Sequence, residues 1–371
     1  MLKLALTAAI SMMLVFEPVA AEAKSKGRTA VVKRIKVKKH EPAKLVASDN
    51  RQRLVRRVIK VRGKRKVVYE QVRRAAPALA ILSAGDLAGL NLTHDPLALR
   101  SSVAYVLDQD SSEVLFEKNS SVALPIASIT KLMTGFVVVQ AHQNLDEILT
   151  VTEDDVDHHK FTSSRLQVGT RMTRGDLLHI ALMSSENRAA AALGRNYPGG
   201  INAFVAAMNA KARELSMNNT HYVDSSGLSS QNVSSARDLA KLVSMAHHEP
   251  LLRQYTTDPN YVVEAGGRAL RYSNTNYLVA MPDWNIGLQK TGFINEAGRC
   301  LVMQAMIQGR NVVMVFLDSK GKQSRTADAG RMRRWLEAIK PPVIPAAAAA
   351  GVPVTVSAGA GVGVGAAPLV Q

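Results

Sequence analysis

The order of secondary-structure patterns along the middle of the chain constrains its fold more than any other feature. Five strand-like runs lie at the two ends of this part: 103–107, 113–117, 284–293, 299–308 and 311–318. Between them, apolar residues recur at helical spacing from 128 to 248, and a closing helix is predicted over 325–340. This order predicts an α/β (α+β) fold, in which an antiparallel sheet flanked by helices receives strands from both ends and carries an inserted helical lobe.

The charge of the chain is concentrated in one segment. The sequence has a formal net charge of +17, and residues 24–74 hold 20 lysines and arginines against 3 acidic residues, which leaves 27 of each sign elsewhere. A neutral domain is therefore expected over 84–340, preceded by a basic extension over 24–83. We expect this extension to be a solvated, disordered arm. The alternative is a segment that binds an anionic partner, such as a wall polymer or membrane surface. Its alternation of charge with Val and Ile around Gly63 leaves a cationic hairpin as an alternative.

The two ends of the chain have compositions of their own. Residues 1–23 combine Lys3, an apolar run of 13 residues over 4–16 and small residues near Ala21, which predicts a cleaved signal peptide and a periplasmic location. An uncleaved anchor is the alternative, although the run is shorter than a membrane-spanning helix requires. Nucleic acid is not an expected partner of an exported chain. Residues 341–371 are rich in Ala, Gly and Val without charge, and predict a flexible tail.

Three short motifs follow one another inside the expected domain. Ser128 to Lys131 reads S-x-x-K, Ser185 to Asn187 reads S-x-N, and Lys290-Thr291-Gly292 reads K-T-G. The first two patterns also occur elsewhere, for example S-x-x-K again at Ser319, and only K-T-G is unique. Ser128, however, opens a long apolar run that predicts a buried element. The ordered triplet, each motif in a suitable context, indicates a serine acyl-transfer site that uses lysine as the base.

The residue types of the first two motifs fit that chemistry. A serine needs its proton removed before it attacks, and a lysine three residues later lies on the same face of a helix. Burial and a neighbouring like charge from Lys290 are expected to lower the pKa of Lys131. Ser185 is expected to pass the proton to the leaving amine, and Asn187 to orient a peptide group of the substrate.

The third motif is expected to bind the substrate. Lys290 and Thr291 suit a carboxylate, and the strand that carries them can pair with an extended peptide along its edge. Gly292 leaves room where a ligand approaches the backbone closely. The backbone N–H groups of Ser128 and Phe293 are the predicted oxyanion hole.

Longer stretches around the motifs resemble the low-molecular-mass penicillin-binding proteins, the serine D,D-peptidases. The similar stretches are 124–134, 173–178, 183–190, 224–228, 232–238 and 290–300. The Ser-Glu-Asn form of the second motif and the run 290–300 resemble the D-alanyl-D-alanine endopeptidase branch, of the penicillin-binding protein 7 type. The resemblance implies the penicilloyl-serine transferase fold over 84–340, peptidoglycan as substrate in cell-wall remodelling, β-lactams as inhibitors that acylate Ser128, and no cofactor.

Alternatives to a D,D-endopeptidase remain at this point. A D-alanyl-D-alanine carboxypeptidase uses the same acylating groups, although its branch often carries a further β-rich domain that the 31 residues after 340 cannot hold. A β-lactamase needs a second base, and the nearest run to the class A motif, at Glu214, has the wrong spacing. A wall-binding protein with a vestigial site is the third alternative. No metal site is expected, because the histidine pairs at 158–159 and 247–248 point in different directions. Cys300 is expected to be a buried apolar residue.

Overall fold

The computed structural model describes residues 53–61, 64–72 and 81–339. The chain divides into two units, Met1–Pro77 and Ala78–Gln371, and each is described by itself. The expected signal peptide at 1–23 and the expected tail at 341–371 lie outside the described residues. The domain expected at 84–340 lies within the second unit.

The first unit contains a two-stranded hairpin. Strand β1 (Arg53–Val61) pairs antiparallel with β2 (Lys64–Val72), and Val61 opposes Lys64 next to the turn. The hairpin alternative therefore holds for these two strands, and the expectation of a disordered extension does not hold there. Val58 opposes Val67, and both side chains are exposed.

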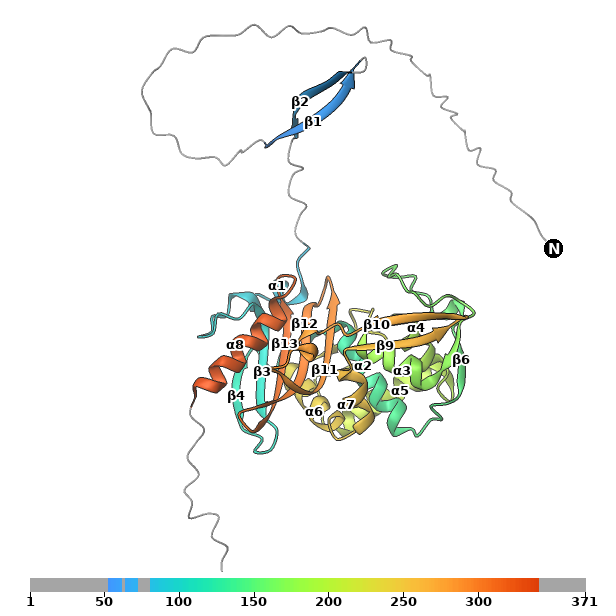
Figure 1. Cartoon of the computed structure of the whole chain (residues 1–371). Helices are drawn as coiled ribbons and strands as arrows, with labels where there is room; N and C mark the ends of the chain where they lie inside the picture. The colour runs from blue at the N-terminus through green and yellow to red at the C-terminus, as the bar shows by residue number, and fades with distance from the viewer. Residues whose placement is uncertain (1–52, 62–63, 73–80, 340–371) are drawn as a thin grey trace, which may run out of the picture. The chain divides into compact units, whose positions relative to one another are not determined.

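A five-stranded antiparallel sheet forms one half of the second unit (Figure 1). Its order is β11-β12-β13-β3-β4, with bounds Asn285–Ile294, Gly298–Ile307, Arg310–Ser319, Ser101–Asp108 and Val114–Lys118. Each of these strands matches one of the five predicted runs to within a few residues. Because β3 pairs with β13, the first and last strands of the domain lie together in the middle of the sheet.

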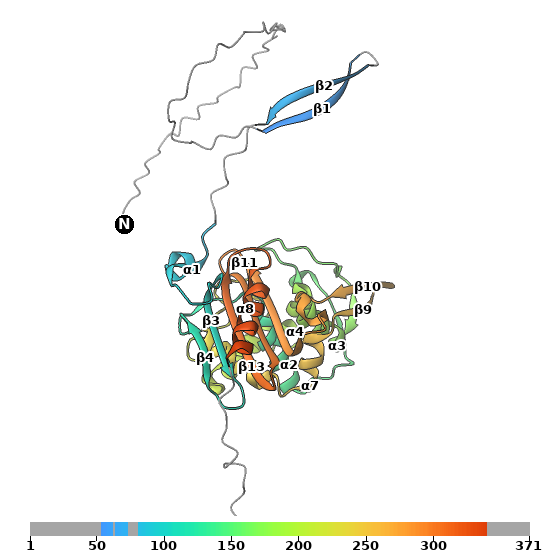
Figure 2. The same cartoon turned by 60° about the vertical axis from the view of Figure 1, so that its left-hand side comes forward.

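The two faces of the sheet bury different partners, as alternation along the strands requires. In β13, Val313 and Val315 join the main core beneath the helical lobe, whereas Met314 and Phe316 join a second core. This second core is covered by α8 (Ser324–Ala338), which matches the predicted closing helix. Figure 2 shows α8 crossing this outer face of the sheet.

The helical lobe fills the middle of the chain. Its helices are α2 (Thr130–Gln140), α3 (Arg174–Met183), α4 (Asn187–Arg195), α5 (Gly200–Glu214), α6 (Ala236–Ala246) and α7 (Pro250–Thr257). Side-chain caps start α3 and α6, where Thr173 and Ser235 accept the backbone N–H groups of Asp176 and Asp238. A short helix, α1 (Ala84–Leu87), precedes the sheet. No helix in the described part of the chain is long and apolar enough to cross a membrane.

Short strands interrupt the helical pattern in places that the sequence analysis did not predict. They are β5 (Leu124–Pro125) with β8 (Val233–Ser234), β6 (Ile148–Thr150) with β7 (Arg171–Thr173), and the hairpin of β9 (Asn260–Ala265) with β10 (Arg268–Ser273). The strand that matters most for the site is β11, which is an edge strand and borders the helical lobe (Figure 1). A short 3-10 helix, η2 (Ala127–Ile129), packs against it.

Candidate active site

Ser128 lies where η2 runs into α2, at the boundary between sheet and lobe. Its neighbours Ile129, Leu132 and Met133 are fully buried and anchor this turn in the main core. Lys131 stands one turn further on, and its Nζ donates to Ser128 Oγ at 2.9 Å. The predicted contact between serine and lysine on one helical face is therefore present.

Lys131 has three polar neighbours and no exposed surface. Besides Ser128, its Nζ donates to Asn187 Oδ1 at 2.7 Å and to the Ser226 carbonyl oxygen at 2.6 Å. Burial lowers the pKa of Lys131 from its ordinary value to about 8, although the carboxylates of Asp224 and Glu186 act in the opposite direction. Such a lysine can serve as a base close to neutral pH.

The loop that presents Ser226 had no predicted role, although the run 224–228 was noted. The Asp224 carboxylate accepts the backbone N–H groups of Ser226 and Gly227 at 2.6 and 2.5 Å, which shapes the turn. Gly227 has a positive φ of 81°, and a Cβ there would lie 2.0 Å from the carbonyl oxygen of Ala127. The glycine therefore lets this loop approach the turn that carries Ser128.

Ser185 and Lys290 form a second pair on the opposite side of the site. Ser185 lies between α3 and α4 with a positive φ of 65°, and its Oγ accepts from Lys290 Nζ at 2.9 Å. Lys290 also donates to the Thr291 carbonyl oxygen at 2.9 Å and is fully buried. Burial lowers the pKa of Lys290 well below its ordinary value, and the positive charges of Lys131 and Arg325 lower it further.

The electrostatic prediction is confirmed in one part and corrected in the other. Burial lowers the pKa of Lys131 as expected, but the charge of Lys290 does not contribute to that shift. Instead, after burial, the charge of Lys131 lowers the pKa of Lys290. The Arg325 guanidinium, which no motif pointed to, donates to the Gly292 carbonyl oxygen at 2.8 Å and adds to this effect.

The amide of Asn187 is bound on both sides by the protein. Its Oδ1 accepts from Lys131, and its Nδ2 donates to Thr162 Oγ1 at 3.0 Å. In this structure the side chain contacts Lys131 and Thr162, and its role in orienting a substrate peptide group stays a prediction. Thr162 was not predicted, because it lies in a loop without a recognisable pattern.

The K-T-G strand, β11, lies beside the turn that carries Ser128. Thr291 Oγ1 lies 2.6 Å from Thr275 Oγ1, and a Cβ on Gly292 would lie 3.2 Å from the backbone nitrogen of Ser128. The glycine thus allows β11 to approach η2 closely. Phe293 is half exposed, with the Arg299 guanidinium 4.5 Å from its ring. The oxyanion hole of Ser128 and Phe293 stays a prediction.

The other sequence features lie apart from these residues. Ser319 ends β13 and donates to Ser324 at 2.7 Å. Cys300 is buried, which raises the pKa of its thiol to about 12 and makes it unreactive. His158 and His159 are exposed. No group of three or more side chains suited to a metal ion occurs among the residues that the structure describes.

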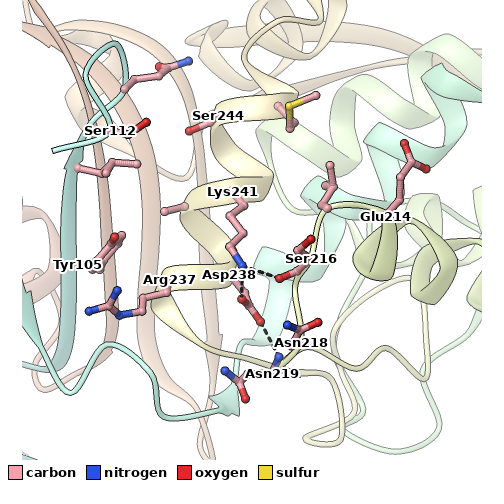
Figure 3. A pocket seen from close by; sticks show the side chains of 15 residues that line it. Tyr105, Ser112, Glu214, Ser216, Asn218, Asn219, Arg237, Asp238, Lys241 and Ser244 are labelled. Carbon is pink, nitrogen blue, oxygen red and sulfur yellow. Dashed lines mark hydrogen bonds and ion pairs between the residues drawn. The ribbon is translucent and has the colours of Figure 1, made fainter. Parts of the chain in front are cut away.

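Two pockets of similar size lie on this unit. One, of about 610 Å³, borders the site at Asn187 and Ser226 and extends along the acidic loop 154–157. The other, of about 580 Å³, lies between β3 and α6 and is lined by Tyr105, Arg237 and Lys241 among others (Figure 3). None of the three motifs contributes to the second pocket, and Lys241 there is bound to Asp238 and the Ser216 carbonyl oxygen.

A buried lysine against a serine, a second serine–lysine pair and a K-T-G edge strand form the kind of site that penicillin-binding D,D-peptidases share with serine β-lactamases. The model of the D-alanyl-D-alanine carboxypeptidase family matches residues 91–321, and the chain belongs to that family. It is 49% identical over 263 residues to the D-alanyl-D-alanine endopeptidase of Pseudomonas aeruginosa, covering 70% of this chain and 84% of that protein. The Escherichia coli D-alanyl-D-alanine endopeptidase is 44% identical over 67% of this chain and 81% of its own length.

Solved structures agree with the fold. The Streptomyces K15 DD-transpeptidase superposes with a TM-score of 0.62 at 27% identity, over 67% of this chain and all of that one. Penicillin-binding protein D2 of Listeria monocytogenes, solved with cefotaxime bound, gives a TM-score of 0.59 at 28% identity, over 65% of this chain and 98% of that one.

Proposed function

We propose that this chain is a D,D-endopeptidase that hydrolyses D-alanyl cross-links of peptidoglycan through an acyl-enzyme on Ser128. The observation that carries the proposal is the position of Lys131 Nζ, which is buried, 2.9 Å from Ser128 Oγ, and otherwise surrounded by oxygen acceptors. A base placed in this way activates a serine without a histidine.

Each proposed step uses a contact of the site. Lys131 takes the proton of Ser128 as its Oγ attacks the carbonyl carbon of a D-alanine. The oxyanion that forms is held by the backbone N–H groups of Ser128 and Phe293. Ser185 passes its proton to the leaving amine and regains one from Lys290, which lies 2.9 Å from it. Water then attacks the acyl-enzyme and gives up a proton to Lys290, while Lys131 returns its proton to Ser128 Oγ as the peptide is released. β-Lactams enter the same first step and remain on Ser128.

The cross-link, rather than a terminal D-alanine, is the proposed substrate because of the relatives. The two that share 44% and 49% identity are both named endopeptidases, whereas carboxypeptidases such as the one of Bacillus subtilis are 29% identical. The acylating groups alone do not separate the two activities, since both need the same serine and lysine.

Mass spectrometry of the intact protein tests the mechanism. After mixing with benzylpenicillin, we expect one adduct on the wild type and none on Ser128→Ala. An adduct on the variant would contradict the role of Ser128. Consumption of the antibiotic without a lasting adduct would favour the β-lactamase alternative.

Purified muropeptides test the substrate. We expect faster cleavage of cross-linked dimers than release of D-alanine from monomeric pentapeptides, with both reactions lost in Ser128→Ala. Faster release of D-alanine would identify a carboxypeptidase instead.

We further propose that residues 1–23 direct the chain to the periplasm and are removed there. Fractionation of cells followed by N-terminal sequencing tests this: a mature chain that begins near residue 24 in the periplasmic fraction supports it. An intact N-terminus in the membrane fraction would favour the uncleaved anchor.

The basic hairpin is proposed to bind an anionic surface. Residues 53–72 hold eight lysines and arginines against one glutamate, and charges of this density attract phospholipid head groups or acidic polymers. Full-length protein should sediment with phosphatidylglycerol vesicles at low salt, and less when these eight residues are changed to glutamine. Equal sedimentation of the two proteins, or equal binding to neutral vesicles, would reject this role.

A further inference from the structure

One loop outside the three motifs holds the amide of Asn187. Within it, Thr162 Oγ1 accepts from Asn187 Nδ2 at 3.0 Å and donates to Asp157 Oδ2 at 2.8 Å. Asp157, Thr162 and Asn187 thus form a hydrogen-bonded chain that ends at Lys131 Nζ.

Each donor in this chain points toward Asp157: Lys131 donates to Asn187, Asn187 to Thr162, and Thr162 to Asp157. The Asp157 carboxylate also accepts the backbone N–H groups of His159, Lys160 and Thr162 at 2.9 Å each. These bonds lower the pKa of Asp157 to about 2, against the effect of its partial burial, so the group is an ionised acceptor near neutral pH.

The acceptor at Asp157 determines the orientation of the next two groups. Thr162 has a single O–H hydrogen, which goes to Asp157, and a lone pair of its oxygen is left for Asn187. The NH₂ group of Asn187 therefore faces Thr162, and its Oδ1 faces Lys131. An amide turned by 180° would place two N–H groups against Lys131 instead.

The orientation of the Asn187 amide determines where the lone pair of the Lys131 amine points. A neutral lysine amine has two N–H hydrogens and one lone pair. Asn187 Oδ1 and the Ser226 carbonyl oxygen are acceptors only, so they take the two hydrogens. The lone pair of Lys131 is then directed at Ser128 Oγ, the third neighbour at 2.9 Å.

We propose that Thr162 and Asp157 are positioning residues for acylation, which fix the amide of Asn187 so that the lone pair of Lys131 faces Ser128. Without the Thr162 hydroxyl, the amide is free to turn, and its NH₂ group then competes with Ser128 for that lone pair. The proposal rests on the proposed role of Lys131 as the base.

A valine at position 162 keeps the shape of the side chain and removes both hydrogen bonds. We expect Thr162→Val to lower the plateau of the second-order rate constant for acylation by benzylpenicillin by roughly 10- to 100-fold, within the range of general-base catalysis. Thr162→Ser should restore it to within about threefold, because serine keeps the hydroxyl group. The plateau rate constant of Asp157→Asn should lie between those of Thr162→Val and Thr162→Ser.

The dependence of the acylation rate on pH distinguishes a positioning role of Thr162 from a general increase in the mobility of its loop. Other charged groups facing Lys131 are Lys290 on β11, Asp224 in its loop and Glu186 at the start of α4, and none of them changes in Thr162→Val. A turned amide donates to the neutral amine and disfavours the ammonium. The acid limb of the rate profile should therefore move to lower pH in Thr162→Val, together with the loss in plateau.

Two controls complete the experiment. Ser163→Ala changes the exposed neighbour of Thr162 and should leave the profile unchanged. Lys160→Ala removes the ion pair that ties the same loop to Glu296, and so reports on loop mobility without altering the hydrogen-bonded chain. Unchanged thermal unfolding of Thr162→Val would show that its fold is intact.

Three results would overturn the proposal while Ser128→Ala still abolishes the adduct. The first is an unchanged acylation rate in Thr162→Val. The second is a lower plateau rate whose acid limb stays at the same pH or moves to higher pH. The third is an equal loss of plateau rate in Thr162→Val and Lys160→Ala. Failure of the mechanism itself would instead appear as an adduct that persists in Ser128→Ala.

Discussion

Lys131 and Lys290 are both fully buried in one site, yet their surroundings differ. Lys131 has three oxygen neighbours and two nearby carboxylates, so the effect of burial on its pKa is partly offset. Lys290 donates to the Ser185 hydroxyl and the Thr291 carbonyl oxygen, and its nearby charges, Lys131 and Arg325, are both positive.

The difference supports the two different roles that we propose for these lysines. Burial lowers the pH at which each amine becomes neutral, and the neighbouring charges shift that pH further up or down. The pKa of about 8 leaves roughly a tenth of Lys131 neutral at pH 7, against about one part in three thousand at its ordinary value. Lys290 faces a local excess of positive charge, which suits a site that awaits a carboxylate.

Removal of Lys131 should have the largest effect. We expect Lys131→Met to lower the rate constant for acylation by benzylpenicillin by roughly 1,000-fold or more, because no other base contacts Ser128 Oγ among the described residues. Quenched-flow mass spectrometry measures the rate. A loss smaller than tenfold would mean that another group, with Lys290 as the first candidate, takes the proton.

The same variant should change the dependence of stability on pH. The folded pKa of Lys131 is depressed, so between about pH 8 and 10.5 the unfolded state binds more protons and stability rises with pH. From pH 7 to 10.5, wild type should gain up to about 3 kcal/mol of unfolding free energy relative to Lys131→Met. Urea unfolding at the two pH values measures this difference, and parallel curves would show that Lys131 is not depressed.

The wild-type rate should follow the titration of Lys131. Because the neutral amine is the base, acylation should rise about 50-fold from pH 6 to pH 8 and level off above a midpoint near pH 8. Stopped-flow measurement with a chromogenic cephalosporin gives this profile. A flat profile over this range would indicate that the proton is taken by a group with a much lower pKa.

Removal of Lys290 should have a smaller effect on the acylation rate. Lys290→Met removes the partner of Ser185, so we expect this rate to fall roughly tenfold at pH 8. The loss should be greater for β-lactams that carry a carboxylate than for amide-capped analogues. Equal losses for both kinds of compound would argue against a carboxylate site at Lys290.

The sequence predicted the sheet well because its signals are local. Strands β3, β12 and β13 are runs of mostly apolar residues, long enough to be recognised by themselves. The two-residue strands β5 and β8 were missed, since such short strands are defined by their pairing across the fold rather than by composition.

The same division applies to the site. The motif residues were found because their spacing along the chain reflects their geometry, as for Ser128 and Lys131. Ser226 and Thr162 were missed because they contact Lys131 and Asn187 from 95 and 25 residues away, and distance along the chain carries no pattern. Gly227 was the available signal, since a glycine after Asp-Ser-Ser predicts a turn with positive φ.

The pairing of β3 with β13 has a consequence for how the protein forms. Val103 opposes Leu317, so the centre of the sheet closes a very long loop, and such contacts slow folding. During synthesis, Ser128 emerges well before β11, which carries Lys290 and Gly292. A chain arrested before β11 thus holds Ser128 but lacks Lys290 and Gly292. On the proposed mechanism, acylation therefore begins only when the domain is complete, and it can report that completion.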